Sequence, residues 1–282
     1  MVENRPFLAL LTHLVLLIGV VVVVFPVYLA FIASTHGSGD FMRGLVPLLP
    51  GPYMLENYGK MLTEGISTAG APPLWMMLMN STIIAVIIAV GKISISLLSA
   101  YAIVFFKFPF RMVAFWIIFI TLMLPVEVRI IPTFAVVANL GLLNSYVGLT
   151  LPLIASATAT FLFRQFFLTV PDELMEAARV DGAGPMKFFR DILLPLSRTN
   201  IAALFVILFI YGWVQYLWPL LVTTESRYYT VVMGIKRLAA TADAEPQWNF
   251  VMAAVILAML PPVLVVILMQ RLFVKGLVET EK

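Results

Sequence analysis

The sequence predicts an all-α membrane protein that crosses the bilayer six times. Of its 282 residues, 62% are hydrophobic and only 12% are charged, whereas a soluble domain carries about 25% charged residues. The apolar residues gather in runs close to the ~20 residues that a helix needs to cross a bilayer. A transmembrane barrel would show alternating segments of ~10 residues instead, so composition and run length both favour helices.

Six apolar runs are candidate spans. The first run is longer than the core of a signal peptide, and no small-x-small cleavage site follows it, so we interpret it as a retained span. The second run is long enough to tilt or to extend beyond the bilayer. The candidate spans are residues 12–33, 75–105, 112–132, 146–165, 201–222 and 250–272.

The distribution of lysine and arginine predicts the orientation of these spans. An even number of spans puts both termini on one side of the membrane. That side, with the 106–111 turn and the 164–200 loop, holds eleven basic residues against six on the other side. By the positive-inside rule both termini and the loop face the cytoplasm. The net charge of +3 therefore reflects topology and does not indicate a nucleic-acid partner.

The spans and their orientation divide the chain into three predicted regions. Residues 1–74 comprise the N-terminal span and a polar periplasmic segment rich in glycine and proline. Residues 75–275 comprise the other five spans and a charged cytoplasmic loop at 166–200. Residues 276–282 form a cytoplasmic tail.

The sequence offers little for catalysis. It has no cysteine and only two histidines, so no disulfide, thiol nucleophile or cysteine-based metal site can form. A membrane enzyme would need a convergent acid, base or metal set, and we predict no catalytic residue, metal site or cofactor. The Gly91–Ser94 segment is not a phosphate-binding loop, because Val86 stands where the motif requires glycine. Any use of ATP would therefore belong to a partner.

The 166–200 loop is the one long charged stretch, and it predicts two short helices joined by a sharp turn. Pro171 suits the first turn of a helix. Gly182 and Gly184 permit the left-handed geometry that stops this helix and reverses the chain. Pro185 is expected to start the second helix and Pro195 to end it.

The second helix of the loop carries three apolar side chains on one side. Phe188, Phe189 and Ile192 are spaced so that they lie close together on a helix. Exposed phenylalanines in a loop that faces water would form an interaction patch. The sequence thus predicts a partner-binding surface on this helix.

The loop resembles the EAA loop of binding-protein-dependent ABC importer permeases. A DNA-binding helix-turn-helix is the rival interpretation, but flanking spans would hold it against the membrane. By the resemblance, the turn around Gly182 sits in a cleft of a separate ATPase subunit, and Glu176 pairs with a basic group there. The small Ala177 and Ala178 would permit close helix contact. The residues that fill the pattern, and that we expect to couple the chain to the ATPase, are Glu176, Ala177, Ala178, Gly182, Ile192, Leu194 and Pro195.

The resemblance extends over the whole chain, within the maltose-type group of permeases. Four further segments are similar to the second permease subunits of sn-glycerol-3-phosphate importers, whereas residues 1–75 match the broader group poorly. The implied architecture is that of a type I ABC importer permease. The four segments are Met1–Phe7, Leu122–Ile130, Ser156–Phe167 and Tyr211–Pro219.

The resemblance also implies partners and a solute. The expected complex contains a sister permease, two copies of one ABC ATPase and a periplasmic solute-binding protein, in a bacterial inner membrane. It would import sn-glycerol-3-phosphate, or a related glycerophosphodiester, by alternating access. Import of a neutral sugar remains an alternative. A self-sufficient secondary transporter is a further alternative, against which stand the charged loop and the scarcity of carboxylates within the spans.

Three residues are candidates for the solute path. Lys92 lies inside the second span, where a cation costs about 2.5–3.5 kcal/mol. It could pair with a phosphate or with a carboxylate of the sister subunit, or it could snorkel or pack against backbone carbonyls. Arg129, near the outer end of the third span, could receive an anion or form a structural ion pair. Gln215 lies among aromatic residues near the outer end of the fifth span, where such residues usually form an interfacial belt.

Overall fold

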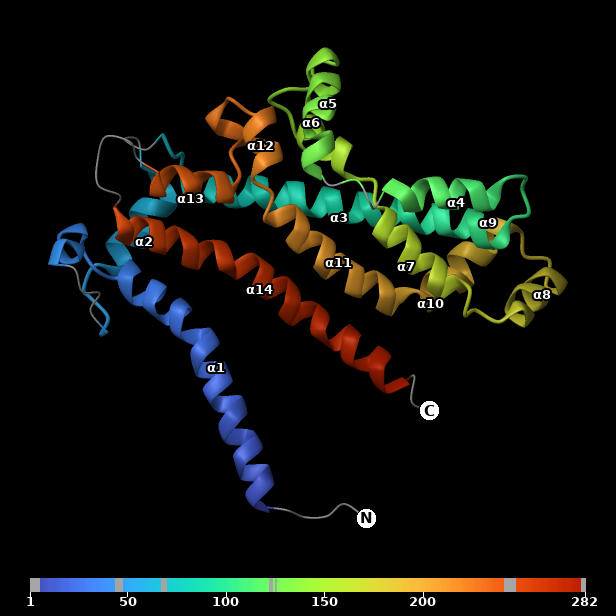
Figure 1. The fold of residues 1–282 in the computed structure, drawn as a ribbon, viewed down its shortest axis with the longest axis horizontal. Coiled ribbons are helices and arrows are strands. Elements are labelled where there is room, and N and C mark those ends of the chain that lie inside the picture. Colours follow the sequence, from blue (N-terminus) through green and yellow to red (C-terminus); the bar gives the residue numbers. More distant parts are fainter. Residues whose placement is uncertain are drawn as a thin grey trace. The chain divides into compact units, whose positions relative to one another are not determined.

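The computed structural model describes residues 6–43, 48–66, 70–121, 124, 126–240 and 247–279. Every regular element within these ranges is helical (Figure 1). The chain forms two compact units. The smaller unit comprises Met1–Met76 and Gly234–Leu260, and the larger unit comprises Met77–Met233 and Pro261–Lys282.

The elements follow one another along the chain without any long interruption. Those up to the fourth apolar run are α1 (Pro6–Ser34), η1 (Ser38–Arg43), α2 (Met54–Thr63), α3 (Leu74–Phe105), α4 (Arg111–Ile120), α5 (Val126–Asn139), α6 (Tyr146–Thr150), η4 (Leu151–Leu153) and α7 (Ala157–Phe167). Those that follow are α8 (Asp172–Val180), α9 (Pro185–Phe188), the π-helical η5 (Phe189–Leu193), α10 (Leu194–Leu196), α11 (Arg198–Trp213), α12 (Leu217–Val222), η6 (Ser226–Tyr228), α13 (Val231–Ala239) and α14 (Trp248–Glu279).

In the smaller unit, hydrogen bonds hold α2 against the chain that leaves α1. The buried Asn57 side chain donates to the carbonyl oxygens of Ser34 at 2.9 Å and His36 at 2.8 Å, and accepts from the Asn249 amide at 3.1 Å. The Tyr58 and Ser34 hydroxyls lie 2.8 Å apart. Burial raises the pKa of Tyr58. Its hydroxyl therefore stays protonated at neutral pH and remains available for this hydrogen bond.

The first helix is apolar around its whole circumference. Within α1, Leu10–Ser34 is long and apolar enough to cross a membrane, and only 6% of its most apolar window is buried. A helix that is hydrophobic on all sides needs an apolar environment. The structure therefore agrees with a first span close to the predicted residues 12–33.

The core of the larger unit lies where α3 meets α5, α6 and α12. The Trp218 indole N–H, which is buried there, donates to the Gly148 carbonyl at 3.2 Å. This bond satisfies a polar group that would otherwise be costly to bury. The buried core residues are Ile84, Ile88, Val137, Leu149, Leu153, Trp218 and Val222.

Two glycines in the larger unit allow close approach between elements. A Cβ atom on Gly91 would lie 2.7 Å from Cγ2 of Ile154, and one on Gly212 would lie 2.8 Å from Cα of Ala85. Glycine is the residue that permits such backbone proximity. The second contact brings α11 directly against α3.

Three described helices are long and apolar enough to cross a membrane, and two bent helix pairs raise this number to at most five. The bent pairs are Tyr146–Leu153 with Ala157–Phe167, at 47°, and Pro185–Leu196 with Arg198–Trp213, at 72°. The long helices contain Leu10–Ser34, Leu74–Phe105 and Trp248–Gln270. The count of six spans stays a prediction.

The candidate third span, residues 112–132, is not one continuous helix. The structure has two shorter helices there, α4 ending at Ile120 and α5 beginning at Val126. Pro125 explains the break, because proline lacks a backbone N–H and disfavours helical geometry in the residue before it. Pro125 itself lies outside the described residues.

The predicted fourth and fifth spans are also interrupted. In the fourth, η4 ends at Leu153 and the Ser156 hydroxyl caps a new helix by accepting from the Ala159 N–H at 3.2 Å. In the fifth, α11 ends at Trp213 and α12 begins at Leu217. A hydrophobic run thus located each region correctly but did not show where the helix breaks.

Candidate coupling site

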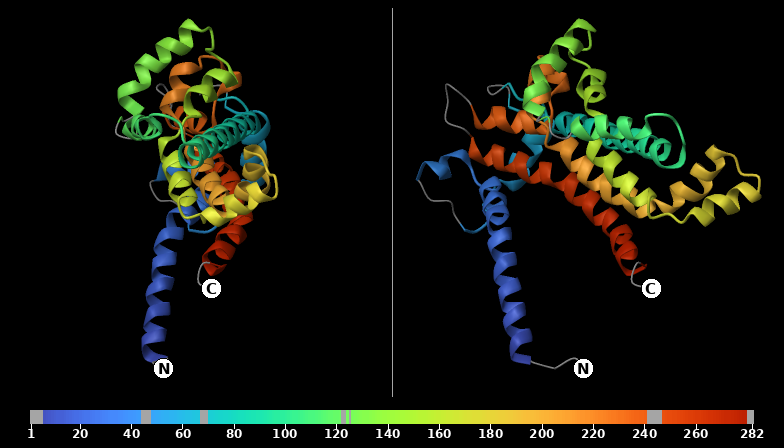
Figure 2. Two further views of the ribbon diagram at one scale, coloured as in Figure 1. Left: turned by 90° about the vertical axis from the view of Figure 1, so that its right-hand side faces the viewer. Right: turned by 45° about the vertical axis from the view of Figure 1, so that its right-hand side comes forward.

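The charged loop lies at one end of the larger unit, as Figures 1 and 2 both show, away from α5 and α12. It begins where α7 ends at Phe167 and reaches α11 at Arg198. Pro171 precedes α8 in an extended conformation, with φ −60° and ψ 137°. Asp172 and Glu173 occupy the first turn of α8, where negative charge favours the positive end of the helix dipole.

A sharp turn follows α8, as predicted. Gly182 has φ +73°, in the left-handed region that glycine adopts without steric cost. The Ala183 N–H donates to the Ala178 carbonyl at 2.8 Å, and the Gly182 N–H donates to the Arg179 carbonyl at 3.0 Å. These bonds satisfy carbonyl groups at the end of α8.

The same expectation for Gly184 is wrong. Gly184 has φ −70° and ψ 168°, which is extended backbone that any residue adopts. It precedes Pro185, and a residue before proline is restricted to this region. One left-handed residue, Gly182, is therefore enough to reverse the chain.

The second half of the loop is a single irregular helical path. It starts with Pro185 at the first position of α9, passes through the π-helical turn η5, and ends at Leu196 before the 72° bend. Pro195 lies inside this path and does not end it. The buried Ser197 hydroxyl donates to the Leu193 carbonyl at 2.6 Å, which satisfies a backbone group at the bend.

The predicted phenylalanine patch on this helix is wrong, because the phenylalanines pack inward. Phe188 is buried, with its ring 5.4 Å from that of Phe105, and the Phe189 ring lies 5.0 Å from that of Tyr101. The Tyr101 hydroxyl also donates to the Pro185 carbonyl at 2.8 Å. Aromatic contacts and a hydrogen bond therefore fix the start of this helix to the end of α3.

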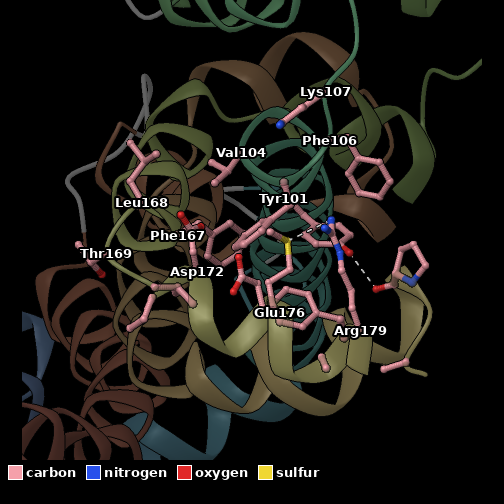
Figure 3. A pocket seen from close by; sticks show the side chains of 18 of the residues that line it. Tyr101, Val104, Phe106, Lys107, Phe167, Leu168, Thr169, Asp172, Glu176 and Arg179 are labelled. Atoms are coloured by element: carbon pink, nitrogen blue, oxygen red, sulfur yellow. Dashed lines mark hydrogen bonds between the residues drawn. The ribbon is translucent and has the colours of Figure 1, made fainter. Parts of the chain in front are cut away.

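A hollow of about 1110 Å³ separates α8 from the end of α3 and the turn that follows it. Figure 3 shows Lys107 at the top of the view, with Asp172, Glu176 and Arg179 below it on α8. Arg111 completes the charged lining. Both acidic and basic groups of the hollow are thus within reach of a partner that enters from the loop side.

The three residues of the Glu-Ala-Ala motif on α8 do not all face the hollow. Asp172, Met175, Glu176 and Arg179 line the hollow, and their spacing places them on one face of the helix. Ala177 is exposed and does not line the hollow. Ala178 is buried at 5% exposure and also lines the hollow.

The other predicted coupling residues lie away from the hollow. Gly182 is exposed in the turn, and Ile192, Leu194 and Pro195 are half-buried in the irregular helical path. The structure therefore brings together Glu176 and Ala178, and places the other predicted residues in the turn and before the bend. The exposed Val180, with 88% of its surface accessible, lies beside the turn and was not predicted.

The contribution of α3 and the 106–111 turn to the hollow was not predicted from the sequence. Lys107 and Arg111 served only to orient the spans, and Tyr101 carried no signal because Pro185 is 84 residues away. Lys107 and Arg111 lie four residues apart at the end of a long apolar run, and this spacing is the sequence signal that could have indicated their place in the site.

An exposed ion pair lies on the outer side of the second helix. The Arg190 Nε donates to Oδ1 of Asp191 at 2.7 Å. This hydrogen bond and the neighbouring positive charges lower the pKa of Asp191. Because both groups are in water, the pair keeps Asp191 ionised and adds little to stability.

Among the candidates for the solute path, Lys92 lies near the middle of α3 and is only 7% exposed. Its ammonium lies 4.0 Å from the centre of the Tyr211 ring on α11, and the positive charge of Arg129 acts on it. No ion pair between Lys92 and a carboxylate occurs in the described part of the chain. The Glu127 side chain lies outside the described residues.

Gln215 lies one helical turn beyond Tyr211. Its side-chain amide donates to the Tyr211 carbonyl at 3.1 Å, and the residue is half-buried. Tyr211 thus contacts two of the three candidates, Lys92 through its ring and Gln215 through its carbonyl, a role that was not predicted from the sequence.

Comparison with known proteins gives the same architecture. Residues 92–279 match the family described as binding-protein-dependent transport system inner membrane component. A solved bacterial ABC transporter for import of the acidic polysaccharide alginate superposes with a TM-score of 0.81, covering 96% of this chain and 98% of that one. At 20% sequence identity, this likeness establishes the fold.

Relatives with much higher identity cover the full length. The chain is 61% identical over 282 residues to the sn-glycerol-3-phosphate transport system permease protein UgpE of Agrobacterium fabrum (strain C58), covering 100% of both sequences. It is 61% identical to that of Rhizobium meliloti (strain 1021) and 57% identical to that of Escherichia coli O1:K1, again over 100% of both.

The helical fold, its apolar spans and the loop between α7 and α11 define a multi-pass transport subunit of the inner membrane that is not itself an enzyme. The chain belongs to the binding-protein-dependent transport system inner membrane components, the permease subunits of ABC importers. Within that family it is similar to second permease subunits.

Proposed function

We propose that this subunit imports sn-glycerol-3-phosphate across the inner membrane, driven by a separate ATPase that docks on the 166–200 loop. The observation that carries the coupling role is the arrangement of α8, the Gly182 turn and the hollow beside Glu176. The solute rests on 57–61% identity over the full length to proteins named for sn-glycerol-3-phosphate transport. A glycerophosphodiester is the related alternative.

In this proposal the partners are a sister permease, two copies of the ATPase and a periplasmic binding protein. Both termini and the loop face the cytoplasm. A basic group of the ATPase enters the hollow and pairs with Glu176, while Ala177 and Ala178 allow the helix to approach closely. The turn at Gly182 lies in the cleft of the ATPase.

Movement of the docked ATPase reaches the membrane through two connections. Phe188, Phe189 and Tyr101 connect the second helix of the loop to α3. Ile192, Leu194 and Pro195 lie in the path that enters α11 across the 72° bend. ATP-driven closure of the ATPase dimer would therefore tilt α3 and α11 together and alternate the access of the solute path, on which we place Lys92, Arg129 and Gln215.

The coupling proposal is tested by reversing one charge on α8. In proteoliposomes that contain the complete complex, we expect Glu176→Lys to lower ATP-dependent uptake of sn-glycerol-3-phosphate at least tenfold, because a cation replaces the partner of a basic group. Gly182→Pro should have a similar effect. Radiolabelled uptake and retention of the ATPase on the purified permease are the measurements.

Glu173→Lys is the matched control. Glu173 carries the same charge on the same helix and is exposed, but it does not line the hollow. We expect its uptake to stay within twofold of the wild type. Normal uptake by Glu176→Lys would contradict the coupling role, and uptake driven by an ion gradient without the ATPase would favour a secondary transporter.

A further inference from the structure

Lys92 is a buried cation inside an apolar helix, and the described chain offers it no counter-charge. It lies near the middle of α3, a 32-residue helix that contains no acidic residue. The side chain is 7% exposed, and its ammonium lies over the face of the Tyr211 ring, 4.0 Å from the ring centre. A cation–π contact compensates only part of the cost of removing an ammonium from water.

A second cation lies in the same region. Arg129 on α5 acts electrostatically on Lys92, and its neighbour Ile130 packs against the core formed with Ile88, which lies one turn before Lys92 on α3. Tyr211 packs against that core as well. The packing of α3 and α5 therefore places the positive charge of Arg129 close enough to act on Lys92, whose ammonium lies over the Tyr211 ring of α11.

Like charges repel each other, and here one of the two, Lys92, is buried while Arg129 is exposed. An anion shared between them would relieve the repulsion. A phosphate monoester suits both groups. The guanidinium of arginine presents a fork of donors that matches phosphate oxygens, and the lysine ammonium binds phosphate as a compact charge. A neutral sugar would leave both cations uncompensated.

We propose that Lys92 and Arg129 form a phosphate subsite within this subunit, and that the Tyr211 ring is the alternative partner of the Lys92 ammonium when no anion is bound. The ammonium therefore has a partner whether or not an anion is present: the phosphate when it is bound, and the ring when it is not. The contact between Gly212 and Ala85 fixes the position of Tyr211 beside α3. This inference rests on the proposed function and adds to it the group that recognises the phosphate.

The test compares uptake with ATP consumption in proteoliposomes that contain the whole importer and its binding protein. For Lys92→Met, we expect uptake of sn-glycerol-3-phosphate to fall at least tenfold, while stimulation of ATP hydrolysis by the loaded binding protein stays within twofold. The ATP hydrolysed per molecule imported should therefore rise at least fivefold. Lys92→Arg should recover most of the uptake, and Arg129→Gln should behave as Lys92→Met does.

Lys60→Met is the matched control, because Lys60 on α2 also lies over an aromatic ring, that of Phe250 at 5.2 Å. Its uptake should equal that of the wild type. Wild-type uptake by Lys92→Met would overturn the subsite while leaving the proposed function in place. Parallel loss of assembly, hydrolysis and uptake, restored by Lys92→Arg, would also overturn it and indicate a structural ion pair with the sister subunit. If the wild type imported no sn-glycerol-3-phosphate, the proposed solute and the subsite would both fall.

Discussion

Gly182 and Gly184 lie two residues apart in the charged 166–200 loop, yet only Gly182 has a backbone conformation that requires glycine. Its φ is +73°, whereas that of Gly184 is −70°. A Cβ atom would meet no other atom within 4 Å at either position. The difference between them is therefore conformational and not a matter of space.

Gly182→Ala should weaken docking of the ATPase, whereas Gly184→Ala should not. A left-handed conformation costs an ordinary residue roughly 1–2 kcal/mol, and about 1 kcal/mol corresponds to a factor of roughly 5 in a conformational population. We thus expect the dissociation constant for binding of the isolated ATPase to rise roughly five- to thirtyfold for Gly182→Ala. Binding measured on the purified permease would test this. Equal losses for both variants would show that the turn is not the determinant.

Gly212 shows the opposite case, in which space is limiting. A Cβ atom there would lie 2.8 Å from the Cα of Ala85, a backbone atom that cannot move without shifting α3. Gly212→Ala should destabilise the larger unit by about 1–3 kcal/mol through overpacking. Thermal unfolding in detergent measures the effect. Gly59→Ala, in a helix where nothing lies within 4 Å, should not lower the melting temperature, and a similar loss there would contradict the explanation.

At the scale of whole elements, α8 and the helical path after it differ in how they are held. α8 carries exposed residues on one face and borders the hollow with the other. The irregular helical path from Pro185 to Leu196 is fixed to the end of α3 by Phe188, Phe189 and the hydrogen bond from Tyr101. In the proposed function, α8 therefore provides the surface for the ATPase, and the helical path from Pro185 to Leu196 transmits its movement.

The breaks in the apolar runs also belong to this scale. Hydrophobicity predicts that a segment lies in lipid, but helix continuity depends on backbone hydrogen bonds that composition does not report. Pro125 and Ser156 mark two of the breaks in the sequence. They became interpretable only when the structure showed α4 separate from α5, and a capped helix beginning after Ser156.

At the scale of the whole molecule, topology can be tested directly because the chain contains no cysteine. Val180 and Leu55 are 88% and 86% exposed, so a single cysteine at either position should react readily. In intact cells a membrane-impermeant maleimide should label Leu55→Cys and not Val180→Cys. Inverted vesicles should give the reverse pattern. Labelling of Val180→Cys from outside the cell would contradict the cytoplasmic position of the loop.

The sequence by itself determined the helical membrane class, the position of the charged 166–200 loop and the turn at Gly182. These features depend on local properties, namely the hydrophobicity of long runs and the backbone freedom of glycine. The resemblance of the Glu176–Pro195 segment to permease loops added the family, which the comparisons confirm.

Tertiary structure alone decided which residues meet. The inward packing of Phe188, the hollow beside Glu176 and the position of Tyr211 over Lys92 all join segments far apart in the chain. Contacts of this kind depend on how helices pack and where they bend, and no periodicity within a single run encodes that arrangement.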